Sequence, residues 1–311
     1  MISYAQNFED VMLARVFAGR NTGFYVDVGA ADPVNLSVTK WFYDLGWSGI
    51  NLEPNKQLFD RLMADRPRDI NLECGVGAVA SEALFFEPDV GELSSFDTRA
   101  QQSAKSSGMQ GSTRPVPVVP LTDLLNQHSE GRDIDFLKID VEGWELEVIK
   151  GLDLRQYRPV VLIIEATAPR SQVESHLEWE PLVLAANYSF VYFDGVNRFY
   201  IANERSELRM HFASPPNAFD EFESFPLVRA RADAEERLKS IHQLDGILAD
   251  LQARLADSER DREARLVAMQ SLEKLVAELE RDLLQANASL KKILDSRFWK
   301  ITHPKWLRLY R

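Results

Sequence analysis

Short apolar runs alternate with helical spacing along the first two hundred residues, and this alternation constrains the fold more than any other feature. Apolar runs that stop at Gly, Pro or an acidic residue indicate buried strands, and apolar residues three or four apart indicate helices. The expected strands are 24–28, 49–53, 70–76, 136–140 and 160–164. The expected helices are 34–45, 56–66, 143–150 and 174–187. Alternating units of this kind predict an α/β fold with a doubly wound, mostly parallel sheet.

The end of this region predicts a different connection. Two aromatic runs, 188–193 and 198–202, flank the segment that begins with Asp194-Gly195. Asp-Gly between two β-runs is typical of a tight hairpin, whose strands are antiparallel. The sheet is therefore expected to end in an antiparallel hairpin.

The chain changes character near Pro215-Pro216. After about Leu227 it contains a single glycine, Gly246, and no proline until Pro304. Long stretches without these residues favour a continuous helix. We therefore divide the chain into four predicted parts, which are a globular domain over 1–205, a linker over 206–226, a helix over 227–296 and a tail over 297–311.

The predicted helix carries a heptad pattern from Leu244 onward. Apolar residues occupy 12 of its 15 seam positions, and the three exceptions are Ser258, Arg262 and Arg265. A sustained heptad seam with charged flanks indicates a coiled coil, and the clustered exceptions indicate a weak middle. Packing on its own domain is the alternative, but the narrow seam and the length favour self-association, so we expect a homo-oligomer.

The C-terminal tail reverses the charge of an otherwise acidic chain. Residues 291–311 contain seven Lys or Arg and one Asp, interleaved with aromatic residues, whereas the whole chain has a formal net charge of −12. Basic and aromatic residues together are typical of segments that lie on anionic membranes. The tail is expected either to make peripheral membrane contact or to dock on a partner.

Composition excludes several classes of protein. An excess of acidic residues disfavours general binding to nucleic acid, and one cysteine, Cys74, cannot form a disulfide within the chain. The densest apolar run, 159–164, is too short to span a bilayer. The first ten residues lack a basic start and an apolar core, so we expect no secretory signal and a cytoplasmic protein.

The expected strands end in residues suited to ligand binding. In a doubly wound sheet, ligands bind beyond the carboxyl ends of the strands. The residues at those ends are Asp27, Gly29, Glu53, Asp140, Glu142 and Glu165. Any one of the acids is as readily explained as a helix cap or a solvated loop residue. Four strand ends that all present carboxylates are better explained by a nucleoside-containing cofactor.

Several stretches resemble the FkbM-type methyltransferases over roughly residues 3–202. The matching stretches are 3–10, 25–30, 45–54, 93–96 and 134–143, and the most specific is the last, Ile134-Asp135-Phe136-Leu137-Lys138-Ile139-Asp140-Val141-Glu142-Gly143. The resemblance implies the seven-stranded class I methyltransferase sheet, S-adenosylmethionine as cofactor and methyl transfer, usually to oxygen. Pro33 departs from the pattern, since many such loops carry glycine there.

The cofactor that the resemblance implies assigns a role to each strand end. Asp27 and Gly29 are expected to hold its methionine part, Glu53 its ribose, and Gly75 with Val76 its adenine. Cys74 is expected to be a small buried residue rather than a nucleophile.

The fourth strand end is expected to carry the chemistry. Asp140 and Glu142 are the candidate catalytic residues, as base or for positioning the acceptor, and the alternative is that either one holds the cofactor's ammonium. A divalent metal bridging these two acids and Glu165 is an alternative, but three acids without a fixed spacing are weak evidence for one, and no metal ligand is assigned.

We therefore predict an O-methyltransferase. The tail resembles segments that follow coiled coils in bacterial polysaccharide-assembly enzymes, which implies a sugar hydroxyl of a surface glycan or its lipid-linked precursor as acceptor. The alternatives are a methyltransferase of a small metabolite and an inactive domain on a coiled-coil scaffold. The expected location is the cytoplasm, at the inner membrane surface where the tail makes contact.

Overall fold

The computed structural model describes the chain except residues 89–93, 98–100, 103–109, 170, 258–261 and 296–311, and the side chains of 250–268. It divides into two units. The first is Ser3–Pro216, and the second joins Met1–Ile2 to the chain from Asn217 onward.

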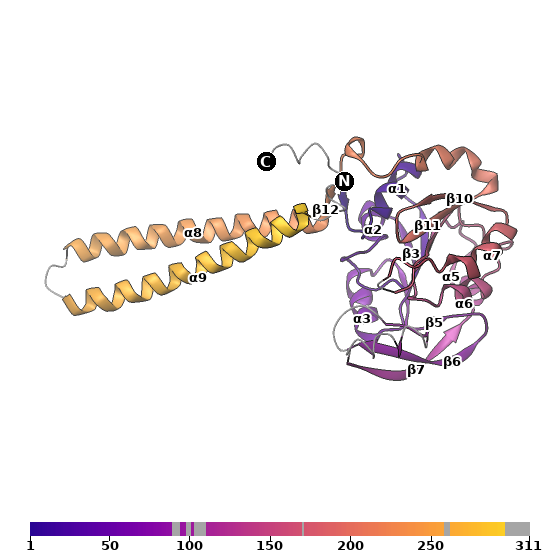
Figure 1. Cartoon of the computed structure of the whole chain (residues 1–311), viewed down its shortest axis with the longest axis horizontal. Coiled ribbons are helices and arrows are strands. Elements are labelled where there is room, and N and C mark those ends of the chain that lie inside the picture. Colours follow the sequence, from indigo (N-terminus) through magenta and orange to yellow (C-terminus); the bar gives the residue numbers. More distant parts are fainter. Residues whose placement is uncertain (89–93, 98–100, 103–109, 170, 258–261, 296–311) are drawn as a thin grey trace. The chain divides into compact units, whose positions relative to one another are not determined.

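The first unit is built on a seven-stranded sheet in the order β10-β11-β9-β8-β2-β3-β4 (Figure 1). The five strands from β9 to β4 are parallel, and β11 runs antiparallel to both of its neighbours. Their bounds are β2 Phe24–Val28, β3 Ser48–Leu52, β4 Ile70–Leu72, β8 Phe136–Ile139, β9 Val161–Glu165, β10 Tyr188–Phe193 and β11 Asn197–Ala202. The predicted doubly wound sheet with a terminal antiparallel hairpin is confirmed.

Helices cover both faces of this sheet, because alternate strand residues point to opposite sides. Phe24, Val26 and Val28 of β2 belong to one buried apolar cluster, and Tyr25 belongs to another. The first cluster includes residues of the helices α5 Leu121–His128, α6 Glu145–Lys150 and α7 Glu180–Ala185. The second includes residues of α1 Glu9–Val16 and α2 Lys40–Leu45. The central strands β2, β8 and β9 are therefore buried throughout, as their apolar composition predicts.

Three predicted elements are shorter or divided. The strand expected over 70–76 is split into β4 and β5 Gly75–Val76, which lie in different sheets. The helix expected over 34–45 is reduced to α2, and that expected over 174–187 is divided into a 3-10 turn, His176–Glu178, and α7. The helix α3 Lys56–Asp65 matches its prediction, and Asn55 caps it through two backbone amides.

Residues 29–37 form a loop, although the sequence predicts that a helix begins at residue 34. The Asp32 carboxylate accepts hydrogen bonds from the amides of Val34 and Asn35, both at 2.8 Å. Behind the loop, the buried Arg66 guanidinium donates to the Pro33 carbonyl and to the Ser37 hydroxyl. These contacts satisfy the backbone locally, so helical hydrogen bonds are not needed here. Pro33, the departure from the family pattern, is therefore part of an anchored turn.

A second, three-stranded sheet has the order β5-β7-β6, with β6 at Ser81–Pro88 and β7 at Gly111–Val119. The sequence analysis does not predict β6 and β7. Pro115 and Pro117 argue against a strand, since proline lacks an amide hydrogen. Both prolines lie opposite residues of β6, but on the other side of β7 the strand β5 pairs only with Val118 and Val119. Among the described residues, the edge of β7 beside the prolines is therefore unpaired, and the missing amides are tolerated there.

The remaining elements are short. They are β1 Ile2–Ser3, β12 Glu223–Ser224 and two 3-10 segments, Asn203–Phe212 and Ala218–Asp220.

The C-terminal region forms two long helices, α8 Phe225–Asp257 and α9 Arg262–Asp295, where the sequence predicts one. They lie side by side as an antiparallel hairpin (Figure 1). The Arg237 guanidinium, 20 residues before the end of α8, donates to the Asp282 carbonyl, 20 residues into α9, at 2.6 Å. The break between the helices, after Asp257 and before Arg262, falls in the region of the three polar exceptions in the heptad seam, Ser258, Arg262 and Arg265.

Heptad positions on the two helices face each other. The half-buried residues of the hairpin include Leu244, Leu248, Leu272, Leu279, Leu283 and Leu290, and each of these is a predicted seam position. Much of the seam therefore closes within one chain, a possibility that a single continuous helix does not offer, whereas the seam residues Met269 and Val276 stay exposed. None of the helices that the structure describes is long and apolar enough to cross a membrane. The predicted tail over 297–311 lies outside the described residues.

Candidate active site

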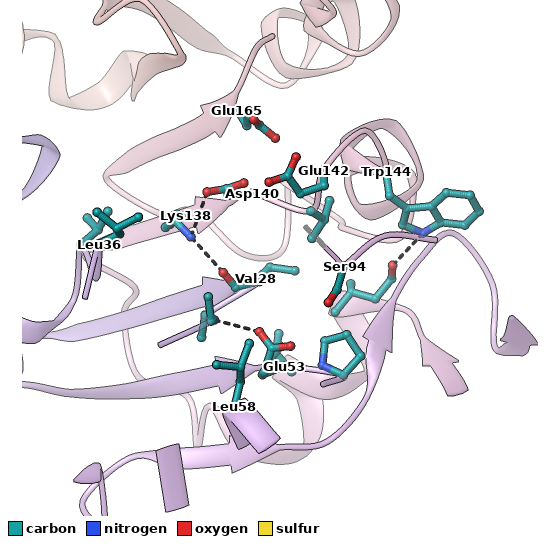
Figure 2. A pocket seen from close by; sticks show the side chains of 18 of the residues that line it. Val28, Leu36, Glu53, Leu58, Ser94, Lys138, Asp140, Glu142, Trp144 and Glu165 are labelled. Atoms are coloured by element: carbon teal, nitrogen blue, oxygen red, sulfur yellow. Dashed lines mark hydrogen bonds and ion pairs between the residues drawn. The ribbon is translucent and has the colours of Figure 1, made fainter. Parts of the chain in front are cut away.

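A cavity of about 480 Å³ opens beyond the carboxyl ends of β2, β3, β8 and β9 (Figure 2). Strand order reverses between β2 and β8, and doubly wound sheets bind ligands at such a switch point. The volume is in the range of sites for ligands of nucleoside size. Six of the seven predicted site residues line the cavity, namely Gly29, Glu53, Gly75, Val76, Asp140 and Glu142.

Gly29 is required by the close approach of two strand ends. Its φ is 78°, and a Cβ at this position would lie 1.9 Å from the carbonyl oxygen of Asp140. The Asp140 amide donates to the Val28 carbonyl at 3.0 Å, and the Gly29 amide donates to the Leu52 carbonyl at 3.0 Å. A side chain at residue 29 would push these loops apart. The glycine therefore brings the backbone of β2 against the acidic end of β8.

Asp27, the seventh predicted residue, lies beneath the cavity rather than on its wall. Its side chain is buried, and a carboxylate oxygen lies 3.3 Å from the Lys138 ammonium. Lys138 also lies 3.4 Å from Asp140 and donates to the Gly29 carbonyl at 3.0 Å. Burial lowers the pKa of Lys138, but the two carboxylates raise it above its ordinary value. Asp27 therefore supports the cavity by holding the lysine, instead of reaching a ligand directly as the sequence analysis expects.

Glu53 closes the loop that follows β2. Its two carboxylate oxygens accept hydrogen bonds from the amides of Ala31 and Asn55, each at 2.8 Å. Burial raises the pKa of Glu53 to about 7, although both amides oppose this shift. Each carboxylate oxygen has a second lone pair, so a ligand hydroxyl in the cavity still finds an acceptor. The expected contact with a ribose diol remains a prediction.

An aromatic wall adjoins the residues expected to hold adenine. Phe85, Phe96 and Trp144 line the cavity beside Gly75 and Val76. The ring centroids of Phe85 and Phe96 are 4.6 Å apart, and those of Phe96 and Trp144 are 6.0 Å apart. The Trp144 indole donates to the Val76 carbonyl at 3.1 Å, which fixes its ring. This wall offers flat apolar surface to a purine.

Cys74 lines the same part of the cavity. Burial raises the pKa of its thiol to about 11, so it is protonated at neutral pH. This agrees with its expected role as a small buried residue.

Three carboxylates converge on one side of the cavity (Figure 2). Oxygen atoms of Asp140, Glu142 and Glu165 all lie within 4.8 Å of one another. Glu165 is buried, and burial together with Asp140, Glu145 and Glu142 raises its pKa well above the ordinary value. Negative charge is therefore concentrated where β8 and β9 end.

The sequence analysis assigns no role to two further residues of the cavity wall, Gln6 and Glu9. They lie in the stretch 3–10, which contributes to the family resemblance but not to a strand end. Glu9 accepts hydrogen bonds from the Asn197 side chain and the Asn7 amide, both at 2.8 Å. Burial and the Asp194 carboxylate raise the pKa of Glu9 to about 8. In the sequence, the only sign that Glu9 belongs to the site is that it is an acidic residue in the stretch 3–10, which contributes to the family resemblance.

The sheet order and the position of the cavity define a class I methyltransferase fold. A family model described as the Methyltransferase FkbM domain matches residues 27–190, and the chain belongs to this family of S-adenosylmethionine-dependent methyltransferases. A comparison with curated proteins finds no match.

The described residues fit this cofactor. The Gly29 cradle admits close backbone approach, and the carboxylates suit a cationic, hydroxyl-bearing ligand. Gly29 and Glu53 would hold its methionine and ribose parts, and Gly75 with Val76 would hold its adenine beside the aromatic wall.

The buried acids predict that the protein loses stability as pH rises. The pKa of Glu9 is about 8 and those of Glu53 and Glu145 about 7, against 4.5 for an ordinary glutamate. The folded state then binds more protons than the unfolded chain, so the free energy of unfolding falls between about pH 5 and pH 8. Urea unfolding at about pH 5.5 and about pH 8.5 measures this fall.

The variant Glu9→Gln serves as the control for this experiment. It removes one titrating group, so it should show a smaller fall over the same range. A free energy of unfolding that is flat, or that increases toward pH 8, would contradict the burial of these carboxyls in the folded protein.

Proposed function

We propose that the enzyme methylates a hydroxyl of a neutral sugar in a bacterial surface glycan or its lipid-linked precursor. The convergence of Asp140, Glu142 and Glu165 in the cavity supports this acceptor class. Carboxylates accept hydrogen bonds from hydroxyls and repel carboxylate or phosphate groups. A neutral polyol is therefore the acceptor that this wall suits best.

The chain's own groups would align the acceptor and receive its proton. Bound S-adenosylmethionine supplies an electrophilic methyl group. Asp140 and Glu142 are placed to accept a hydrogen bond from the acceptor hydroxyl and to hold its oxygen in line. Lys138 pairs with Asp140 from beneath, which holds the carboxylate in position.

Glu53→Ala should weaken cofactor binding by about 1.5–3 kcal/mol, because two ribose hydroxyls lose their buried acceptor. Isothermal titration calorimetry with S-adenosylmethionine measures the change. Glu82→Ala, an exposed glutamate on β6, is the matched control and should bind like the parent protein. Unchanged affinity in a folded Glu53→Ala protein would remove Glu53 from the ribose site.

The acceptor class is tested by transfer of labelled methyl from S-adenosylmethionine to sugars. We expect neutral oligosaccharides to be methylated and matched sugars bearing carboxylate or phosphate to be poor acceptors. Asp140→Asn should lower turnover by about 100-fold or more on the good acceptor. Preferential labelling of the charged sugars, or near-normal turnover by the variant, would refute the proposed role of the acidic wall.

We further propose that the α8–α9 hairpin associates with a second copy of the chain. Large apolar side chains remain exposed on both helices of the hairpin, namely Leu238, Ile247, Met269, Leu275, Val276 and Leu284. The apolar face is thus wider than the seam that one partner helix covers, as in helices of larger bundles. Pairing two hairpins would cover this surface.

Changing Val276 and Leu284 together to glutamate should shift a dimer to monomer, since both side chains are exposed on α9 and not covered by α8. Sedimentation velocity on the full chain measures the mass, and far-UV circular dichroism confirms that the helices persist. A monomeric parent protein, or a dimer unaffected by the double change, would contradict association through this face.

We place the enzyme in the cytoplasm at the inner membrane surface. The support is the basic, aromatic composition of residues 291–311, which suits anionic lipid. A lipid-linked glycan precursor would be presented at the same surface.

A further inference from the structure

The acidic wall contains a carboxylate oxygen that the protein leaves unsatisfied. Glu165 is 7% exposed and lines the cavity, and its Oε2 atom is buried without a hydrogen-bond partner among the described residues. Leaving a buried acceptor unpaired is costly, and the cost is greater when the group is charged. The Glu165 side chain points toward the carboxylates of Asp140 and Glu142 (Figure 2), and ligand oxygens of the three lie within 4.8 Å of one another.

Charge is poorly balanced around this point. Five acids line the cavity among the described residues, Glu9, Glu53, Asp140, Glu142 and Glu165, and Lys138 is the one basic residue on the same described wall. Its ammonium lies on the side of Asp140 that faces Asp27, and both of those carboxylates share it. Oε2 of Glu165, unlike the carboxylates of Asp27 and Asp140, has neither a hydrogen bond nor a cation within the described part of the wall.

The backbone holds Glu142 in place at a cost. Its φ is 51°, in the left-handed region that disfavours a side chain, and Gly143 follows with a φ of 96°. The Ser95 hydroxyl donates to the Glu142 carbonyl at 2.8 Å. The buried Glu145 carboxylate accepts from the amides of Val141 and Gly143, at 3.2 and 3.0 Å. The loop therefore fixes the position of Glu142 next to Asp140 and Glu165.

We propose that Asp140, Glu142 and Glu165 bind one divalent cation of the magnesium or manganese type. All three donors are carboxylate oxygens, which hard cations prefer. Their spacing, within 4.8 Å, is one that an ion can span after small side-chain rotations. A cation here would give Glu165 Oε2 a partner.

A bound cation would also contribute to acceptor binding. Three protein ligands leave coordination positions open toward the cavity, and vicinal sugar hydroxyls are suitable ligands for them. A hydroxyl bound to a cation loses its proton more readily, which assists methyl transfer to oxygen. This second part rests on the proposed function, whereas binding of the cation does not.

The competing explanation is that Glu165 remains protonated and needs no cation. Burial and the neighbouring acids favour its neutral form. Cation binding distinguishes the two explanations. If the three carboxylates form a site, the parent protein binds a cation and Glu165→Gln loses it. If Glu165 only stays protonated, the parent protein has no such site to lose.

Manganese is the probe for this site, since free Mn²⁺ gives an electron paramagnetic resonance signal that falls on binding. Titration of the full chain without cofactor or acceptor should show a site at sub-millimolar concentration, from which Mg²⁺ displaces the ion. Glu165→Gln and Glu142→Gln should each weaken it at least about tenfold. Glu147→Gln, which removes a partly exposed carboxylate paired with Lys150 on α6, is the matched control and should bind like the parent.

Two results would overturn the inference. One is the absence of such a site in the parent protein, and the other is equal affinity in the parent and in both folded variants. Far-UV circular dichroism shows whether each variant remains folded, and Glu142→Gln, at a half-buried position, is informative even if Glu165→Gln does not fold.

The methyl-transfer assay separates this inference from the proposed function. Mn²⁺ binding without methylation of neutral sugars would refute the proposed acceptor and leave the cation site in place. Full activity on neutral sugars in the presence of EDTA, together with no Mn²⁺ site, would refute the cation and leave the acceptor in place.

Discussion

The buried Lys138 ammonium holds the active-site end of the sheet together. It lies between Asp27 at the end of β2 and Asp140 just beyond β8, and it donates to the Gly29 carbonyl. A buried ion pair is stable only when its remaining donors and acceptors are satisfied, and this lysine reaches three acceptors from two strands. Gly29 makes the arrangement possible, because no other residue fits against the Asp140 carbonyl. Loss of the lysine would leave two acids facing each other without a countercharge.

The cavity follows from this junction. Sequence-distant acids meet there because parallel strands end on the same edge, so residues 53, 140, 142 and 165 line one cavity although more than a hundred residues separate the first from the last. The aromatic wall formed by Phe85, Phe96 and Trp144 lines another part of the cavity and is apolar where the carboxylates are charged. One side of the cavity therefore suits a purine and the other suits hydroxyls.

The sequence predicts the sheet well, because its strands are apolar on both faces and end at Gly, Pro or acidic residues. Of the seven site residues predicted from the sequence, six line the cavity. Asp27 was assigned to the ligand because sequence does not reveal that Lys138 lies between them. The second sheet was missed because Pro115 and Pro117 disguise β7, and Glu9 because its position depends on packing against β11. Heptad spacing predicts the seam but not whether its partner is another chain or the same one.

The antiparallel pairing of α8 and α9 determines where α9 ends. A single helix over 227–296 would be about 105 Å long at about 1.5 Å per residue, and its tail would project from the far tip. In the hairpin, Asp295 ends α9 beside the beginning of α8, as the pairing of Arg237 with Asp282 requires. The hairpin therefore begins and ends at the same end of the helix pair, and its length is set by the lengths of α8 and α9. Lengthening or shortening both helices equally would change its span without moving the point at which the tail departs.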